Sequence, residues 1–157
     1  MRSIGVFLLC LGGIGIADAL LKALRCGISR TKALLGFVLR VRDSVENYAM
    51  PISEIFEGCD VGMLRECGWL KEEGTPCELS AFFEECDIND RQVRAILSDL
   101  SREFGKSYRA RQSELLGICV ERLRARVAQL ENELPQRRKL AIGACVGGTL
   151  ILLLLLL

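Results

Sequence analysis

The last eighteen residues, LAIGACVGGTLILLLLLL at positions 140–157, carry no charge and end in eight consecutive Ile or Leu side chains. The other end has a matching run, IGVFLLCLGGIGIADALL at positions 4–21, in which Asp18 is the only charged residue. At a rise of about 1.5 Å per residue, a helix of this length spans roughly 27 Å, close to the thickness of a bilayer core. We therefore predict transmembrane helices at 4–21 and 140–157.

Flanking charges orient the two predicted anchors. Six basic residues follow the first run before any acidic one, from Lys22 to Arg42, whereas only Arg2 precedes it. Arg137, Arg138 and Lys139 stand just before the second run, and nothing charged follows it. Because basic residues favour the cytoplasmic side, the sequence predicts a multi-pass cell-membrane protein with a cytoplasmic central domain and both termini outside.

The rival interpretation of the first run is a cleavable signal peptide. Arg2 gives a minimal basic start, 4–16 an apolar segment, and Ala17-Asp18-Ala19 an A-x-A site. Cleavage after Ala19 would leave an exported, tail-anchored domain. The charge placement favours the double anchor.

Two further features of the sequence are typical of membrane proteins. The basic cluster Arg137, Arg138 and Lys139 suits lipid headgroups at the surface. Gly143 and Gly147 form a G-x-x-x-G pair, a spacing that lets membrane helices pack closely, although apolar helices also contain it by chance.

The segment 25–138 reads as an all-α bundle of about six helices. Apolar periodicity marks a first helical segment over 34–48, and the last helix is predicted to run into the second anchor, with Pro135 as a point where it could bend. Between them we predict helices over 51–57, 61–73 and 76–86, and a fifth helix that Asn89 or Asp90 caps and Gly105 ends.

Charge is unevenly distributed along this domain. The stretch 43–90 has thirteen acidic and two basic residues, a net charge of −11, whereas 91–139 has twelve basic and six acidic residues, a net charge of +6. One interpretation is that the acidic half of the bundle faces the basic half. The other is that an acidic face, with Glu54, Glu57, Glu72 and Glu73 as candidates, docks a basic partner.

Composition and motifs argue against most catalytic, metal-binding and nucleic-acid-binding functions. The chain has no His, which removes His-based catalysis and most zinc sites. Gly105-Lys106-Ser107 resembles the end of a P-loop, but Leu100 stands where its first glycine belongs. Net charge of +1 and few aromatic residues argue against nucleic-acid binding. We predict no enzyme activity, no catalytic residues, no metal and no cofactor.

The eight Cys residues leave one alternative open. No pair has C-x-x-C spacing, so the thiols read best as small core hydrophobes in a reducing compartment. A membrane-tethered redox or metal-binding protein would use the thiols of the central domain: Cys59, Cys67, Cys77 and Cys86.

The layout and several local strings resemble the stage III sporulation protein AB family of endospore-forming bacteria. The most specific string is Phe104-Gly105-Lys106-Ser107 followed by Gln112, where the family shows F-G-x-x-L-G and then Gln; Tyr108-Arg109 replaces its Leu-Gly. The run from Arg137 through Gly143 and Gly147 into the Leu-rich tail also matches. A weaker match is 45–48 leading to Pro51 and Ile52, like the family's E-I-x-Y and downstream P-L.

The resemblance implies a fold, a place and partners. The family's domain resembles the cytoplasmic domains of type II secretion and type IV pilus platform proteins. Members act in the secretion-like channel between mother cell and forespore. The resemblance thus implies a non-enzymatic platform subunit, facing the mother-cell cytoplasm. It would dock a cytoplasmic ATPase encoded nearby and contact the lipid bilayer and the channel's other membrane subunits.

Overall fold

The computed structural model describes the backbone of residues 2–48, 50–71, 76, 78–104 and 109–156, with the side chains of all but 2–11, 13, 14, 109 and 152–156. Six α-helices occur in these residues: α1 Arg2–Asp43, α2 Ile52–Glu57, α3 Val61–Glu66, α4 Leu79–Glu85, α5 Arg91–Glu103 and α6 Arg109–Leu156. A π-helical turn, Ser44–Tyr48, follows α1. The all-α prediction is confirmed for this part of the chain.

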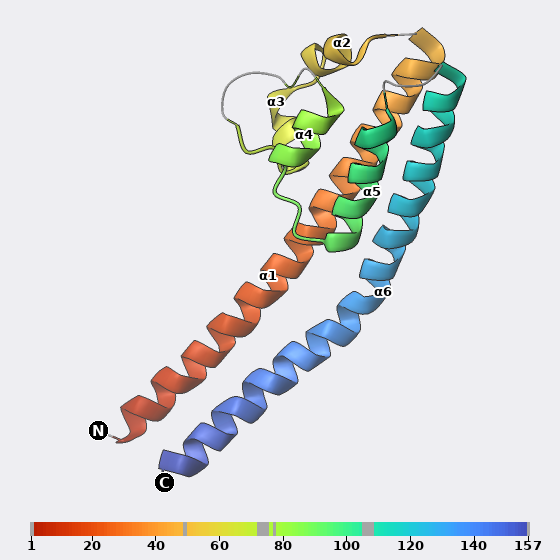
Figure 1. The fold of residues 1–157 in the computed structure, drawn as a ribbon. Coiled ribbons are helices and arrows are strands. Elements are labelled where there is room, and N and C mark those ends of the chain that lie inside the picture. The colour runs from red at the N-terminus through yellow and green to blue at the C-terminus, as the bar shows by residue number, and fades with distance from the viewer. Residues whose placement is uncertain (1, 49, 72–75, 77, 105–108, 157) are drawn as a thin grey trace. The chain divides into compact units, whose positions relative to one another are not determined.

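The molecule divides into two compact units. One comprises Met1–Cys26 and Leu130–Leu157, and the other Gly27–Gln129. Both long helices, α1 and α6, are uninterrupted and belong partly to each unit (Figure 1). The last helix thus runs into the C-terminal apolar run as predicted, and it continues through Pro135. The N-terminal apolar run 4–21 and most of the helical segment predicted over 34–48 belong to one continuous helix, α1, from Arg2 to Asp43.

The predicted membrane spans fall partly outside what the structure describes. Where side chains are described, a set that leaves out most of 1–14 and all of 152–157, no helix has both the length and the apolar character to cross a membrane.

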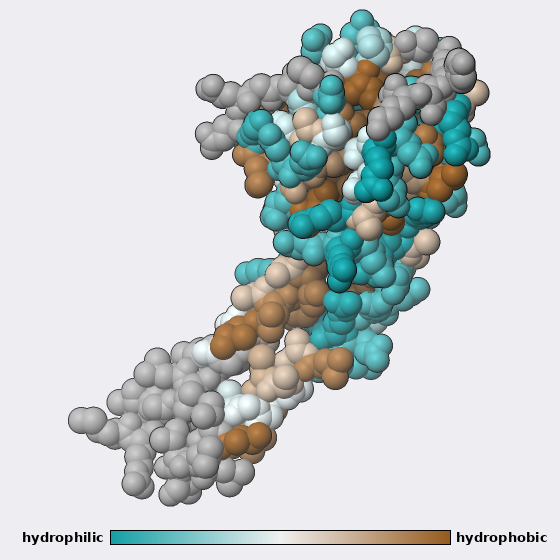
Figure 2. All heavy atoms as spheres, viewed as in Figure 1, coloured by the Kyte–Doolittle hydropathy of each residue, from teal (hydrophilic) through white to brown (hydrophobic). Residues whose placement is uncertain are grey.

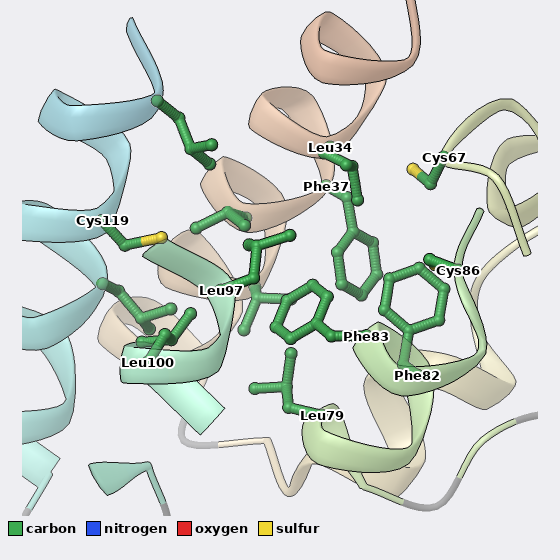
Figure 3. Close-up of a cluster of buried hydrophobic side chains, with 14 of the residues drawn as sticks. Leu34, Phe37, Cys67, Leu79, Phe82, Phe83, Cys86, Leu97, Leu100 and Cys119 are labelled. Carbon is green, nitrogen blue, oxygen red and sulfur yellow. The ribbon is translucent and has the colours of Figure 1, made fainter. Parts of the chain in front are cut away.

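Five aromatic rings form the centre of the unit Gly27–Gln129. Phe82 of α4 is fully buried, and its ring centroid lies 4.8 Å from that of Phe37 on α1 and 5.3 Å from that of Phe56 on α2. Trp69 and Phe83 each lie 5.4 Å from it. Figure 3 shows Phe37, Phe82 and Phe83 converging with Leu79 and Leu97. These rings join α1, α2, α4 and the segment after α3 into one core.

The helices α5 and α6 bury apolar residues at helical spacing. Val93, Leu97 and Leu100 of α5 are buried, three and four residues apart, so they share one face. The buried residues of α6 continue the same core: Leu116, Cys119, Val120, Leu123 and Val127. Tyr48, at the end of the first predicted helical segment, closes the π-helical turn, and its side chain is 72% exposed.

The predicted third helix, 61–73, is wrong in length. It ends at Glu66, and Gly68 has a φ of +97°, which a side chain rarely tolerates. The Gly68 carbonyl accepts a 2.8 Å hydrogen bond from the Asp87 N–H, and Trp69 forms an isolated bridge with Cys86. This short pairing turns Trp69 into the aromatic core. The predicted stop at Gly74 lies outside the described residues.

The predicted helix 76–86 begins late. Its first helical residue is Leu79, because Glu78 is extended, with φ of −136° and ψ of 150°. Thr75, which precedes the predicted helix, is outside the described part of the chain, and Pro76 is buried. By contrast, the short helix before Gly58 is confirmed, with Pro51 as its N-cap.

Asp90 caps α5, as one of the two predicted choices. Its carboxylate accepts hydrogen bonds from the N–H groups of Gln92 and Val93, at 2.8 and 3.1 Å. The same carboxylate forms a mostly buried ion pair with Arg126 of α6, with a nitrogen–oxygen distance of 2.7 Å. One side chain therefore starts α5 and ties it to α6. The predicted break at Gly105 lies beyond the described end of α5.

This arrangement predicts an acid-sensitive contribution to stability. Burial raises the pKa of Asp90, but the hydrogen bonds from Arg126, Val93 and Gln92, with the guanidinium charge, outweigh it and hold the pKa below its usual value. The contribution is therefore present above the unfolded pKa of about 3.9 and lost as pH falls through the folded pKa. We expect Asp90→Asn, which retains capping ability, to lower the free energy of unfolding at neutral pH by about 1–3 kcal/mol.

The measurement is urea unfolding of the full chain in detergent, followed by fluorescence of Trp69, the only Trp. The difference between wild type and Asp90→Asn should shrink between neutral pH and about pH 3. An unchanged difference across that range would contradict the ion-pair explanation.

Candidate functional site

The candidate acidic docking face is only partly described. Glu54 and Glu57 lie on α2, three residues apart and exposed, while Ile55 and Phe56 of the same helix are buried. Burial of one side of α2 thus turns both carboxylates outward, and neither has an ion pair within the described part of the chain. Glu72 and Glu73 lie outside the described residues, so the structure brings together two of the four predicted positions.

Other acidic residues of the stretch 43–90 pair with the basic helices. Asp87 contacts Arg30 of α1, and Asp90 contacts Arg126 of α6. These contacts support the self-complementary interpretation at one end of the acidic stretch. At α2, the exposed glutamates fit the docking interpretation, so the two explanations apply to different parts of the same stretch.

A third acidic residue bridges the two long helices within the bundle. Glu46 accepts hydrogen bonds from Ser113 of α6 and, at 2.9 Å, from Arg42. The hydrogen bond from Ser113 and then that from Arg42 hold the pKa of Glu46 below its usual value. This carboxylate remains charged at neutral pH but is already engaged, so it does not extend the outward acidic face.

The predicted membrane-interface cluster lies on the exposed surface of α6. Arg137 donates to Glu133 at 2.6 Å, whereas Arg138 and Lys139 have no ion pair with any described residue. On α1, Lys22 forms an ion pair with Asp18, four residues earlier, with a nitrogen–oxygen distance of 2.8 Å. The basic side chains of Arg138 and Lys139, unpaired among the described residues, thus directly precede the apolar run 140–157.

Apolar side chains of the terminal unit are exposed. Seven large ones have exposed fractions from 43% to 68%: Ile16, Leu20, Leu140, Ile142, Val146, Leu150 and Ile151. In Figure 2, brown hydrophobic residues interrupt the surface next to the grey ends. A Cβ added to Gly143 or Gly147 would meet no described atom within 4 Å. The predicted close packing at this glycine pair is not among the described contacts and stays a prediction.

In the described part of the bundle, four cysteines are buried: Cys59, Cys67, Cys86 and Cys119. Burial, followed by the nearby Glu66 and Cys59, raises the pKa of Cys67 to about 12. Burial, with Cys67 as the next cause, raises the pKa of Cys86 to about 12. Thiols act as nucleophiles and ligands through the thiolate, so both groups are inert at neutral pH.

The metal alternative has little support in the same residues. Among the described side chains, no group of three or more Cys, Asp or Glu is arranged to hold a metal ion. Cys77, one of its four proposed ligands, lies outside the described residues.

The sequence-based interpretation missed a groove between α5 and α6. It has a volume of about 350 Å³ and is lined by Ile96, Asp99, Leu100, Glu103, Arg111, Leu115, Ile118, Cys119 and Arg122. The spacing 111, 115, 118 and 122 is a single helical stripe, which was the available signal. Two acidic residues lie on its α5 wall and two basic residues on its α6 wall.

Comparison with known proteins gives no relative for this chain. No family model matches it, and no curated protein or solved structure is significantly similar to it.

The state of the cysteines can be tested by native labelling. We expect a maleimide to modify the exposed Cys26 near neutral pH long before it modifies Cys67, Cys86 or Cys119, whose pKa burial likewise raises to about 12. Peptide mass spectrometry of a time course reads the order, with urea-unfolded chain as the control in which all react. Rapid native labelling of Cys67 or Cys86 would contradict burial and revive the redox alternative.

Proposed function

We propose that the chain is a non-enzymatic membrane platform subunit of a secretion-like sporulation channel, and that its central bundle docks a cytoplasmic ATPase. The observation that carries the proposal is the exposed apolar surface of the terminal helical segments. Side chains such as Leu140 and Ile151, 68% and 61% exposed, are unfavourable in water. Fully burying each one would gain about 1.5–3 kcal/mol.

Lipid is the proposed environment of that surface. The exposed large apolar residues after Leu140 are Leu140, Ile142, Val146, Leu150 and Ile151. At about 100° per residue they cover about half of the helix circumference, which is wider than the seam of a single helical partner and suits a bilayer. Free Arg138 and Lys139 at the start of this segment suit phosphate headgroups.

The proposed orientation places the bundle in the mother-cell cytoplasm and both termini outside. Its support is the excess of basic residues on the inner flank of each apolar run. The buried thiols of the bundle suit a reducing compartment. The raised pKa values of Cys67 and Cys86 weigh against the redox alternative, because they keep the thiols protonated.

The identity of the partner complex comes from the resemblance of the sequence to the stage III sporulation protein AB family. An all-α bundle accords with that family's platform-like domain. Within the bundle, Glu54 and Glu57 are proposed to meet basic residues of the ATPase, together with Glu72 and Glu73. Other membrane subunits of the channel would contact the anchors, where Gly143 and Gly147 permit close approach.

The orientation has a direct test in living cells. A reporter that is active only outside the cytoplasm, fused after Leu157, should be active. Replacing Arg137, Arg138 and Lys139 by Glu should reduce its activity, because the charge bias that retains the preceding segment in the cytoplasm is removed. Activity of a cytoplasm-only reporter at the same site would overturn the double anchor.

Docking is tested by co-purification of the full chain with the ATPase. Glu54→Arg with Glu57→Arg should reduce recovered ATPase by roughly tenfold or more, since like charges would then face each other. The matched control is Glu114→Arg with Glu121→Arg, two exposed acidic residues of α6. Equal losses in both variants, or none in the first, would rule out α2 as the docking face.

A further inference from the structure

The groove between α5 and α6 has an apolar floor. Leu100 and Cys119 are buried at its base, and Ile96 and Leu115 are half-buried. Ile118 lies among them with 42% of its surface exposed, although it belongs to a helix whose neighbouring face is fully buried. The groove has a volume of about 350 Å³. Covering its exposed isoleucine with a partner would remove apolar surface from water, which is favourable.

The two walls of the groove carry opposite charges. Asp99 and Glu103 stand on the α5 wall, and Arg111 and Arg122 on the α6 wall. Asp99 stands at the level of Arg122, with a nitrogen–oxygen distance of 3.6 Å. Glu103 stands near Arg111, whose pKa is raised first by the Glu114 side chain and also, more weakly, by Glu103.

These four charged groups are not engaged in strong ion pairs across the groove. The Asp99 and Arg122 side chains are 62% and 57% exposed, and such an exposed pair contributes little. The hydrogen bond of Arg111 goes to Glu114 of its own helix, at 2.8 Å. Glu103 has no ion pair among the described residues. All four groups can therefore still face a partner.

We propose that this groove is a homodimer interface, in which a second copy of the chain packs groove to groove about a two-fold axis that runs along the groove. Such an axis sets the acidic wall of each copy against the basic wall of the other. Asp99 of one copy then faces Arg122 of the other, and Glu103 faces Arg111. A two-fold axis across the groove would instead set acid against acid and base against base. The charges thus choose one arrangement, and the apolar floors, with Ile118 of each copy, meet at its centre.

The arrangement that the charges favour also fixes the relative direction of the two α6 helices in the dimer. An axis along the groove keeps the two α6 segments that line the grooves parallel, so both run in the same direction from Arg111 to Arg122. Two chains anchored in one membrane need this relation, whereas the rejected arrangement runs the helices in opposite directions. The dimer does not rest on the proposed platform function, because the groove and its charges stand without it.

The test uses two full-length chains with different tags, co-expressed and purified in detergent through one tag. Wild-type copies should co-purify above the background of separately solubilised chains that are mixed later. A variant with two basic walls, Asp99→Arg with Glu103→Arg, should lose self-association by roughly tenfold or more. A variant with two acidic walls, Arg111→Glu with Arg122→Glu, should lose it similarly. Co-expressed together, these two variants should associate again, because each supplies the charge that the other lacks.

Controls separate this mechanism from misfolding. The combined four-fold variant exchanges the walls and should recover self-association, which a folding defect would not do. Glu54→Arg with Glu57→Arg, the same charge change outside the groove, should leave dimerisation intact. Self-association of the two-basic-wall variant at the wild-type level would overturn the proposal. So would a mixed pair that associates no better than either variant alone, including the case in which wild type itself is monomeric.

Discussion

The packing of Phe82 against four other aromatic rings is the constraint on which the bundle depends. Its neighbours come from α1, α2, α4 itself and the segment after α3, so elements far apart in the sequence meet at one side chain. The short helices α2, α3 and α4 have six or seven residues each, too few to be stable alone. They hold their places because each contributes to this buried cluster.

The same packing explains which parts of the fold the sequence could predict. Long amphipathic stretches such as Arg91–Glu103 carry their own pattern, and a helix was predicted there correctly. The end of α3 was not, because Gly68 looks like an ordinary interruption in a helical pattern until Asp87 is seen against it. Tyr48 ends a π-helical turn that the sequence pattern did not predict, and its side chain is exposed. A contact between distant segments therefore explains the early end of α3, whereas a local change of helix type accompanies the exposure of Tyr48.

The candidate surfaces show the same division. Burial of Ile55 and Phe56 turns Glu54 and Glu57 outward, and the sequence had singled out both glutamates from charge alone. Charge alone did not separate them from Asp87 and Asp90, whose carboxylates are engaged by Arg30 and Arg126. The groove walls were still harder to predict from the sequence. Asp99 and Arg122 belong to different helices, and only the packing of α5 on α6 brings them to one level.

Pro135 has a mechanical consequence. A proline has no N–H to donate to the carbonyl four residues earlier, so α6 is easier to bend at this position than elsewhere along its 48 residues. The other long helix, α1, has no proline in its 42 residues. The same bending force therefore distorts α6 at Pro135 more easily than it distorts α1 at any position.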